Sequence, residues 1–444
     1  MSDKEVVAST VAEASELRSD FVEVVVRNRR AQPFFGRHPW VFVGAVDRVD
    51  GMKSSSNSLR ARMKEIDGAV DRVDGMTSST VPPGTIAKLV NSEGRFIAWG
   101  LYNPISRIVV RLYSWQLERP LDSAFWQTTI HQAVESRREM FDLNSTNTGC
   151  RLIFSEADGL SGLTVDFYGG FLLVQFTSLA LFLHRDTILT ALQTEVHPKG
   201  IWLRTEKGMR EAEGLDVVDG LLSGQEPPRP LFIDEFGVSY GVDVQQGQKT
   251  GCYLDQRDNR LAASRYLKGA EVLDAFCFSG GFGITALKLG GAASILGIDS
   301  SESALVLAKA NAELNGVADR CQWQRNDVRP ALEAMAGQGT LFDAVILDPP
   351  RMARTRGGMD RAINGYVRLN LLGLQVLKPG GILVTCSCSG LVSRDEFQEM
   401  LAEVARQSGR DIQVLENRGQ PADHPVRVTC PESEYLKVLI CRVS

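Results

Sequence analysis

Short runs of β-branched and aromatic residues, separated by Gly, Pro and Asn, characterise residues 21–117. This pattern predicts short strands joined by tight turns, which a small β-barrel would pair. The preceding residues 1–20 are polar and mixed in charge, and we expect them to be disordered. The strands predicted for the barrel are Phe21–Arg27, Val41–Val46, Thr85–Val90, Arg95–Gly100 and Ile108–Ser114.

A nine-residue sequence occurs twice within the barrel region. Gly44–Met52 is repeated letter for letter as Gly68–Met76, 24 residues further along the chain. Two copies are too few for a repeat architecture, so we interpret residues 44–76 as a tandem duplication that lengthens one loop. One copy is expected to supply a barrel strand, and the linker Lys53–Asp67 is expected to be exposed and mobile.

Residues 118–225 mix helical and strand patterns and are expected to form an α+β central domain. The loop at 155–163 is rich in turn-forming residues, which favours a simple turn between two strands. The predicted helices are Trp126–Phe141 and Leu181–Glu195, and the predicted strands are Leu152–Ser155, Leu163–Tyr168, Phe171–Gln175 and Gly200–Arg204.

Apolar strands alternate with helices over residues 226–444, which predicts a Rossmann-like α/β domain with a doubly wound parallel sheet. Two final strands, Arg427–Cys430 and Tyr435–Cys441, are expected to form an antiparallel hairpin at the sheet edge. The predicted parallel strands are Glu271–Asp274, Ser294–Asp299, Cys321–Arg325, Ala344–Leu347 and Ile382–Thr385, and the helices between them are 283–289, 303–315, 328–335 and 361–377.

The composition is that of a globular protein, with 43% hydrophobic and 23% charged residues. No apolar run approaches the ~20 residues that cross a bilayer. The N-terminus also lacks an apolar signal core, so a cytoplasmic protein with no membrane partner is expected. The 8 cysteines show no CxxC spacing, which predicts free thiols and no metal site.

Charge is distributed unevenly along the chain. The whole chain carries −5, but residues 21–117 hold 14 basic and 8 acidic residues, a net +6 that leaves −11 on the remainder. A basic barrel on an acidic body suits a polyanion such as RNA, although ordinary variation in surface charge explains the excess equally well. Candidate phosphate contacts cluster at the start of the barrel, at Arg27, Arg29, Arg30 and Arg37.

A glycine-rich turn follows the first strand of the predicted parallel sheet. Phe276, Gly280 and Gly281 lie in this turn, where backbone can approach a ligand closely at a helix N-terminus. Gly281–Ala286 also fits the loose dinucleotide pattern, so a nicotinamide-dependent oxidoreductase has to be considered.

Acidic residues at three strand ends help to distinguish a site for S-adenosylmethionine from a site for a nicotinamide dinucleotide. Asp274 precedes the glycines, where a carboxylate would repel a pyrophosphate but could hold a cationic amino acid. Asp299 is placed to accept both ribose hydroxyls, and Asp327 follows the third strand, where an acceptor can meet adenine. Together the three acids favour a site for S-adenosylmethionine, which is a cationic nucleoside without phosphate. The alternative is that each acid is an ordinary helix N-cap.

The fourth and fifth strands end in residues suited to methyl transfer. Asp348 begins the sequence Asp-Pro-Pro-Arg, and Arg351 stands where enzymes that methylate adenine amino groups usually have an aromatic residue. Cys386 and Cys388 end the fifth strand. Methylation of a pyrimidine carbon needs such a thiol, because its addition at position 6 makes carbon 5 nucleophilic, and Asp348 could stabilise that adduct. Packing is the alternative role for either cysteine.

Six segments of the chain carry a family resemblance: His38–Phe42, Gly100–Pro104, Glu156–Asp166, Gln248–Gly251, Leu254–Arg257 and Asp423–Pro425. Together they resemble the RNA cytosine-5 methyltransferases that have an N-terminal PUA domain, whose best-known members methylate 23S ribosomal RNA. The resemblance implies a PUA-like barrel, an α+β middle domain and a Rossmann-like catalytic domain that uses S-adenosylmethionine. It favours Cys388 as the nucleophile, with Cys386 as the alternative, and Gln248 and Lys249 as residues lining the donor pocket or forming a polar interdomain turn.

The chain also departs from this family. The two-cysteine branch of RNA cytosine-5 methyltransferases carries a second cysteine in the fourth-strand loop, where this chain has none, so the group that releases product is undefined. Three alternatives remain: an RNA methyltransferase acting on another base such as guanine with structural cysteines, an NAD-dependent oxidoreductase, and an RNA-binding protein with an inactive catalytic domain. The sequence leaves open whether the protein is a homodimer.

Overall fold

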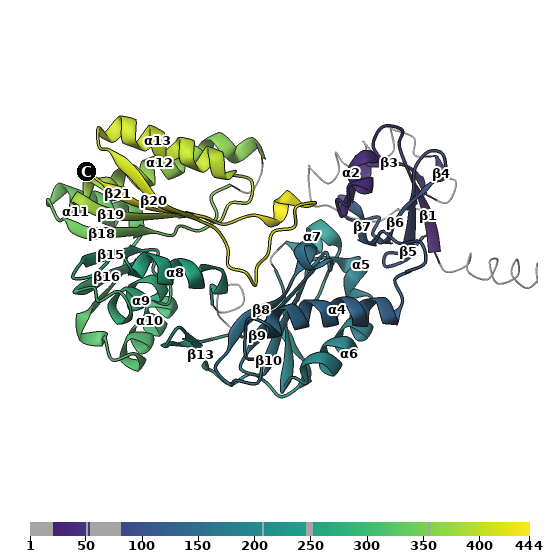
Figure 1. The fold of residues 1–444 in the computed structure, drawn as a ribbon, viewed down its shortest axis with the longest axis horizontal. Helices are drawn as coiled ribbons and strands as arrows, with labels where there is room; N and C mark the ends of the chain where they lie inside the picture. Colours follow the sequence, from purple (N-terminus) through teal and green to yellow (C-terminus); the bar gives the residue numbers. More distant parts are fainter. Residues whose placement is uncertain (1–20, 50–51, 54–80, 207, 246–251, 354–355) are drawn as a thin grey trace, which may run out of the picture.

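The computed structural model describes residues 21–49, 52–53, 81–206, 208–245, 252–353 and 356–444, which form three large sheets in succession along the chain (Figure 1). The predictions for residues 1–20, for the second copy of the repeat at 68–76, for the linker beyond residue 53, and for Gln248 and Lys249 lie outside these residues. Within the described ranges, no helix combines the length and the apolar character needed to span a bilayer.

Residues 21–114 form the N-terminal sheet, whose buried side chains make a core of their own. Its elements are β1 (Phe21–Val26), α2 (Gln32–Phe35), β2 (Trp40–Phe42), β3 (Val46–Val49), β4 (Met52–Lys53), β5 (Ile86–Val90), β6 (Phe96–Tyr102) and β7 (Ile108–Ser114). The strand order is β2-β7-β6-β5-β1-β3-β4.

The single strand predicted at Val41–Val46 is wrong. A 3-10 turn at Val43–Ala45 separates β2 from β3. Because β2 pairs with β7 and β3 pairs with β1, the chain changes neighbours at this turn. Strand β3 belongs to the first copy of the duplicated sequence, so this copy supplies a barrel strand as expected.

The central sheet has five strands in the order β12-β11-β10-β9-β8. Its elements are α4 (Ser123–Arg138), β8 (Gly149–Phe154), β9 (Leu163–Tyr168), β10 (Phe171–Phe176), α5 (Leu179–Phe182), α6 (Arg185–Val196), β11 (Gly200–Arg204), α7 (Met209–Glu213) and β12 (Gly220–Gly224). The predicted strands are confirmed to within three residues, but β12 was not predicted, because its sequence Gly-Leu-Leu-Ser-Gly lacks the β-branched residues typical of strands.

A buried polar cluster joins the barrel to the central domain. Arg111 on β7 is 7% exposed and forms ion pairs with Glu156 at 3.3 Å and Glu213 at 3.2 Å. The Trp40 indole donates to the same Glu156 carboxylate at 2.9 Å. The loop at 155–163, predicted to be a simple turn, therefore also holds two domains together.

The third sheet has the order β17-β16-β15-β18-β19-β21-β20, with a separate hairpin of β13 and β14 before it. Strands β15 to β19 are parallel, whereas β20 and β21 are antiparallel at one edge. The strands are β13 (Leu231–Glu235), β14 (Val238–Val242), β15 (Glu271–Ala275), β16 (Ser294–Asp299), β17 (Cys321–Arg325), β18 (Phe342–Leu347), β19 (Leu377–Ser387), β20 (Ile412–Arg418) and β21 (Lys437–Val443). The helices are α8 (Arg257–Ser264), α9 (Gly281–Lys288), α10 (Glu302–Leu314), α11 (Val328–Gly337), α12 (Met359–Gln375) and α13 (Arg394–Ser408).

The hairpin predicted at the sheet edge is wrong in its first strand. Strand β21 pairs with β20, whereas Arg427 and Cys430 form only an isolated bridge. The missed strand reads Ile-Gln-Val-Leu-Glu-Asn-Arg and is largely polar, as suits the exposed strand at the edge of the sheet. The residues between β20 and β21, here called the strap (419–436), leave the sheet and extend toward the barrel (Figure 1).

Candidate active site

The carboxyl ends of four neighbouring strands bring the predicted acidic and thiol residues together on one side of the third sheet. In sheet order, β16 ends at Asp299, β15 carries Asp274 next to its last residue, β18 is followed by Asp348, and β19 is followed by Cys388. The Asp348 amide donates to the carbonyl of Ala275 at 3.4 Å, so the ends of β18 and β15 are in contact. The direction of the strand order reverses between these two strands, which is where open α/β sheets bind ligands.

The glycine-rich turn is braced by Asp274. The Gly283 amide donates to Asp274 Oδ2 at 2.9 Å, which fixes the start of α9 against the end of β15. Gly280 has φ +82°, and a Cβ atom there would lie 2.7 Å from the Trp323 ring. Only glycine combines that backbone conformation with such close contact, so the predicted role of Gly280 in shaping the turn has a clear steric basis.

Phe276 and Gly281 also lie in this turn. Phe276 has φ +64°, and its half-buried side chain packs against the core between the sheet and α11 and α12. A Cβ atom at Gly281 would lie 3.1 Å from the Arg260 side chain, which packs behind the turn. Both residues therefore shape the backbone of the candidate donor site.

The carboxylates at the carboxyl ends of these strands repel one another. Burial raises the pKa of Asp274 to about 7, the Gly283 hydrogen bond opposes that rise, and the negative charges of Asp348 and Asp299 add to it. Asp299 accepts hydrogen bonds from the Phe278 amide at 3.0 Å and the Ser301 amide at 2.8 Å. This excess of negative charge suits a cationic ligand and would repel a pyrophosphate.

Asp327 differs from the other two predicted acids. It occupies the N-cap position of α11 on the neighbouring strand end, and its side chain is exposed. It makes no side-chain capping hydrogen bond. The structure thus brings Asp274 and Asp299 together. Asp327 follows the next strand in the sheet, β17, and its side chain is exposed to solvent.

The two candidate thiols lie in different environments. Cys386 is fully buried in the core, and burial, with the charge of Asp348 adding to it, raises its pKa well above the ordinary value. Cys388 is half-buried, and its Sγ lies 3.9 Å from the Pro349 carbonyl oxygen in the loop after β18. Only the second thiol therefore combines partial exposure with contact to the loop that begins at Asp348.

A buried serine that sequence reasoning missed links the two loops. Ser389 Oγ accepts from the amides of Met352 and Ala353, both at 3.2 Å, and lies 3.1 Å from the Tyr366 hydroxyl. Tyr366 in turn accepts from Ser387 at 2.9 Å. These bonds set the spacing between the end of β19 and the loop after β18.

Tyr253 is a second residue that sequence reasoning missed. It precedes α8, is half-buried, and packs edge-on against Phe278 with ring centroids 5.1 Å apart. Burial raises its pKa, and the charges of Asp348, Cys388 and Asp299 add to this effect. Tyr253 therefore lies near the carboxyl ends of β16, β18 and β19. Its place one residue before the segment Leu254–Arg257 was the available signal.

The strap connects all three domains next to the site. His38 on the barrel lies 3.3 Å from Glu432, Arg427 donates to the Glu156 carbonyl at 2.9 Å, and the Tyr435 hydroxyl donates to Asp255 at 2.6 Å. The last of these contacts reaches the loop before α8. The strap therefore contacts the barrel, the central domain and the segment before α8, which lies near Cys388.

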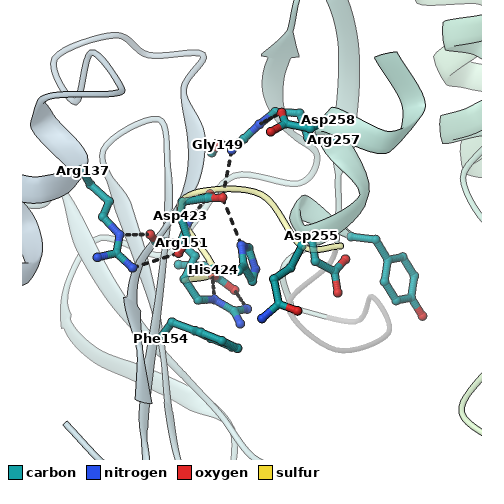
Figure 2. Close-up of polar contacts among 12 residues, drawn as sticks. Arg137, Gly149, Arg151, Phe154, Asp255, Arg257, Asp258, Asp423 and His424 are labelled. Carbon is teal, nitrogen blue, oxygen red and sulfur yellow. Dashed lines mark hydrogen bonds and ion pairs between the residues drawn. The ribbon is translucent and has the colours of Figure 1, made fainter. Parts of the chain in front are cut away.

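Figure 2 shows the most buried part of this connection, around Asp423. Its carboxylate accepts from the Arg151 amide and from Arg257, both at 3.0 Å, and from His424 at 3.1 Å, while Arg137 donates to its carbonyl at 2.9 Å. Burial alone would raise its pKa, but the bond to His424 and the charge of Arg257 hold the pKa of Asp423 well below its ordinary value. This fully paired carboxylate therefore has a structural role: it holds the strap against the central domain and α8.

The four barrel arginines do not share one environment. Arg27 is half-buried and donates to the Val46 carbonyl at 2.9 Å, which fixes β1 to β3. Arg29, Arg30 and Arg37 are exposed. Burial lowers the pKa of Arg427 on the strap, and the charge of Arg37 adds to that effect, so positive charge continues from the barrel onto the strap.

Among the described residues, His38, Cys430 and Glu432 place three metal-type ligand atoms within 4.8 Å of one another. The Trp40 amide donates to His38 Nδ1 at 3.3 Å, which requires a bare nitrogen there. A neutral imidazole then carries its proton on Nε2, facing Glu432, where a metal would need a bare nitrogen. This arrangement fits a hydrogen-bonded pair between barrel and strap.

The comparisons with known proteins agree with this geometry. Residues 200–441 match the family of S-adenosylmethionine-dependent methyltransferases, and residues 66–115 match a PUA-like domain. The fold and the site therefore define an S-adenosylmethionine-dependent methyltransferase with a PUA-like domain, which excludes the nicotinamide-dependent alternative. The PUA-like match begins just before the second copy of the repeat, at residue 66.

Full-length relatives narrow the class further. The chain is 36% identical to ribosomal RNA large subunit methyltransferase I of Citrobacter koseri over 95% of its own length and 99% of that protein. It is also 36% identical to the same enzyme of Shigella dysenteriae, with equal coverage. The chain belongs to the ribosomal RNA large subunit methyltransferase I family.

Solved structures support the fold. An S-adenosylmethionine-dependent methyltransferase described from Streptococcus mutans superposes with a TM-score of 0.76 at 20% identity, over 95% of this chain and 99% of that one. A second methyltransferase structure, which contains SAH, superposes with the same score, identity and coverage. The order of the three sheets is thus shared along almost the whole chain.

Proposed function

We propose that this protein transfers the methyl group of S-adenosylmethionine to carbon 5 of a cytosine in 23S ribosomal RNA through a covalent adduct with Cys388. The observation that carries this proposal is the contrast between the two thiols. Cys388 is half-buried with its Sγ 3.9 Å from the Pro349 carbonyl, beside Asp348, whereas Cys386 lies in the core. A nucleophile must reach the substrate, and the Cys388 thiol meets that condition.

The residues on the donor side fit the proposed cofactor. S-adenosylmethionine supplies an electrophilic methyl group on a sulfonium. Asp274 and Asp299 provide negative charge for a cationic nucleoside with ribose hydroxyls, and the turn at Gly280 lets the backbone approach it. Gln248 and Lys249, which precede this region in sequence, are proposed to line the same pocket.

On the acceptor side, the Cys388 thiolate adds to carbon 6 of the cytosine ring and makes carbon 5 nucleophilic. Carbon 5 then takes the methyl group, and the sulfonium sulfur keeps the electron pair of the broken carbon–sulfur bond, so that S-adenosylhomocysteine leaves as a neutral thioether. The ring nitrogen takes up a proton as the thiolate adds and releases it on elimination. The Asp348 carboxylate is proposed to accept hydrogen bonds from this N–H and from the exocyclic amine, which stabilises the adduct. A base removes the proton from carbon 5, and elimination returns the Cys388 thiolate and the aromatic ring.

RNA is the proposed substrate for two reasons. The relatives are named as enzymes of large-subunit ribosomal RNA, and Arg29, Arg30 and Arg37 on the barrel are exposed and are proposed to contact phosphates. The target base has to leave its stack to reach Cys388, which favours a single-stranded or flipped nucleotide.

The test compares Cys388→Ala with Cys386→Ala as the matched control on the same strand. Ribosomal RNA from cells that lack the protein is treated with each enzyme, and nucleosides are quantified by mass spectrometry. We expect 5-methylcytosine from the wild type and Cys386→Ala but none from Cys388→Ala. RNA that contains 5-fluorocytosine should trap a covalent adduct, because fluorine cannot leave as the proton does.

A different acceptor is the second candidate. If Cys388→Ala retains full activity and the new nucleoside is a methylated guanosine, the cysteines are structural and the covalent mechanism is wrong.

A further inference from the structure

Lys437 is a buried lysine beside the proposed nucleophile. It is the first residue of β21 and pairs in register with Ser387, the last residue of β19. Its side chain is 2% exposed, which is rare for lysine. An ammonium in this position needs polar partners, because a buried charge without them is strongly destabilising.

Those partners are backbone carbonyls. Lys437 Nζ donates to the Ser389 carbonyl at 2.6 Å and to the Tyr435 carbonyl at 3.0 Å. Among the described residues, no carboxylate forms an ion pair with it: nearby Glu434 pairs with Arg394, and Glu396 caps the start of α13. The ammonium is therefore fixed in place by carbonyl oxygens, and the carboxylates that act on its charge, those of Glu434 and Glu396, bond to other groups.

Cys388 lies next to this charge, because the ammonium contacts the carbonyl oxygen of Ser389, the residue that follows Cys388. Burial lowers the pKa of Lys437 to about 8, and negative charge at Cys388 opposes that decrease. Lys437 is still largely protonated at neutral pH with this value. Among the described residues, the titratable groups near Cys388 include Asp348 after β18, Tyr253 before α8, Tyr366 on α12, Tyr435 on the strap, Cys386 on β19 and the cation Lys437.

We propose that Lys437 is a positioning residue, which holds the end of β19 through the Ser389 carbonyl and supplies the positive charge that favours the Cys388 thiolate. A nearby ammonium stabilises a thiolate, whereas Asp348 opposes it. The inference rests on the proposed role of Cys388 as nucleophile. Lys437 itself is too enclosed to contact RNA, so it acts through the residue that does.

The first measurement needs no RNA. Alkylation of Cys388 by iodoacetamide is followed against pH by peptide mass spectrometry in the full-length protein. Replacing the ammonium in Lys437→Met should raise the midpoint of this profile by about one pH unit, and Lys437→Arg should restore it in part. The midpoint is the readout because the plateau rate also depends on thiolate nucleophilicity.

The matched control is Lys378→Met. Lys378 lies on the same strand, β19, but at its opposite end, where it pairs with Asp343 at 2.9 Å on the surface. Its replacement should leave the Cys388 midpoint unchanged. A folded Lys437→Met protein with the wild-type midpoint would overturn the proposal.

A second measurement covers the case in which Lys437→Met does not fold. The titration of Lys437 is followed by NMR in the wild type and in Cys388→Ser, a nearly isosteric change. Because electrostatic coupling is reciprocal, loss of the thiolate should lower the Lys437 pKa. An unchanged Lys437 titration would contradict the proposal.

Activity then separates this inference from the proposed function. Lys437→Met should reduce kcat at neutral pH and leave KM for RNA unchanged, with recovery of kcat as pH rises. If Cys388→Ala is active but both titrations are coupled, the electrostatic pair is real and the covalent mechanism is wrong. If Cys388→Ala is inactive but the titrations are independent, only the role of Lys437 is refuted.

Discussion

The proposed donor half of the site contains Asp274, Gly280 and Asp299, and the proposed acceptor half contains Asp348, Cys388 and Ser389. Different kinds of contacts hold these two halves together. On the donor side, the bonds of Asp274 to Gly283 and of Asp299 to Ser301 and Phe278 join residues 9, 2 and 21 positions apart. On the acceptor side, Ser389 bonds to Met352 and Lys437 across 37 and 48 positions. The donor half is built mainly from one strand–turn–helix segment, whereas the acceptor half forms only when distant strands have assembled.

This difference separates binding from chemistry. The donor turn depends on local backbone conformation and on nearby amides, so substitutions there should change the affinity for S-adenosylmethionine. The acceptor half depends on the spacing of two loops, and small displacements of reacting groups reduce rates steeply. Each prediction below tests whether the two halves respond separately.

The largest effect is expected for Asp348→Asn. Removing the carboxylate charge from the loop after β18 should lower kcat about 10²- to 10³-fold, with a much smaller change in donor affinity. Steady-state kinetics and calorimetry measure the two effects. Asp343→Asn, at the other end of the same strand, serves as the control. Equal losses in kcat and in donor affinity would show that the halves are not separate.

A smaller effect is expected for Ser389→Ala. Two buried amides lose their acceptor, which should cost about 1–3 kcal/mol in the free energy of unfolding. The looser loop spacing should also reduce kcat about 10- to 100-fold, while donor affinity stays constant. Ser161→Ala, a buried serine in the cluster around Arg111, should destabilise the protein without a comparable loss of kcat. A normal kcat in Ser389→Ala would contradict the proposed spacing role.

The smallest effect concerns the pH dependence of donor binding. Burial raises the pKa of Asp274 to about 7, and a cationic donor favours its ionised form. Binding therefore requires loss of a proton at low pH, and affinity should fall about tenfold as pH decreases from 8 to 6. Calorimetry at several pH values checks this slope, and Asp274→Asn should abolish it. A flat wild-type profile would separate Asp274 from the donor charge.

Much of the fold could be predicted because its signals are local. The parallel strands from β15 to β19 and the helices α9 to α12 occur close to their predicted positions. The errors share a physical cause. Strands β12 and β20 are edge strands without a continuous apolar pattern, and the division of β2 from β3 depends on which neighbours each strand finds.

The site divides in the same manner. The acids and glycines of the donor half stand in a short stretch of sequence, so their type and order indicated a cationic nucleoside. Ser389, Tyr366 and Lys437 had no such signal, because each is an ordinary residue whose role arises from contacts with residues far away in the chain. A buried lysine is indistinguishable from a surface lysine until its neighbours are known.

The sequence by itself favoured an S-adenosylmethionine-dependent methyltransferase over an oxidoreductase, gave the order of the five parallel strands and the helices between them, and identified the acidic residues and glycines of the donor turn as candidates. Only the tertiary structure separated Cys386 from Cys388. Two residues apart on a strand, both side chains point to the same face, so periodicity treats them alike. Their environments differ because β19 ends between them: Cys386 is still covered by β21, whereas Cys388 has passed the end of the strand and lies against the loop from β18.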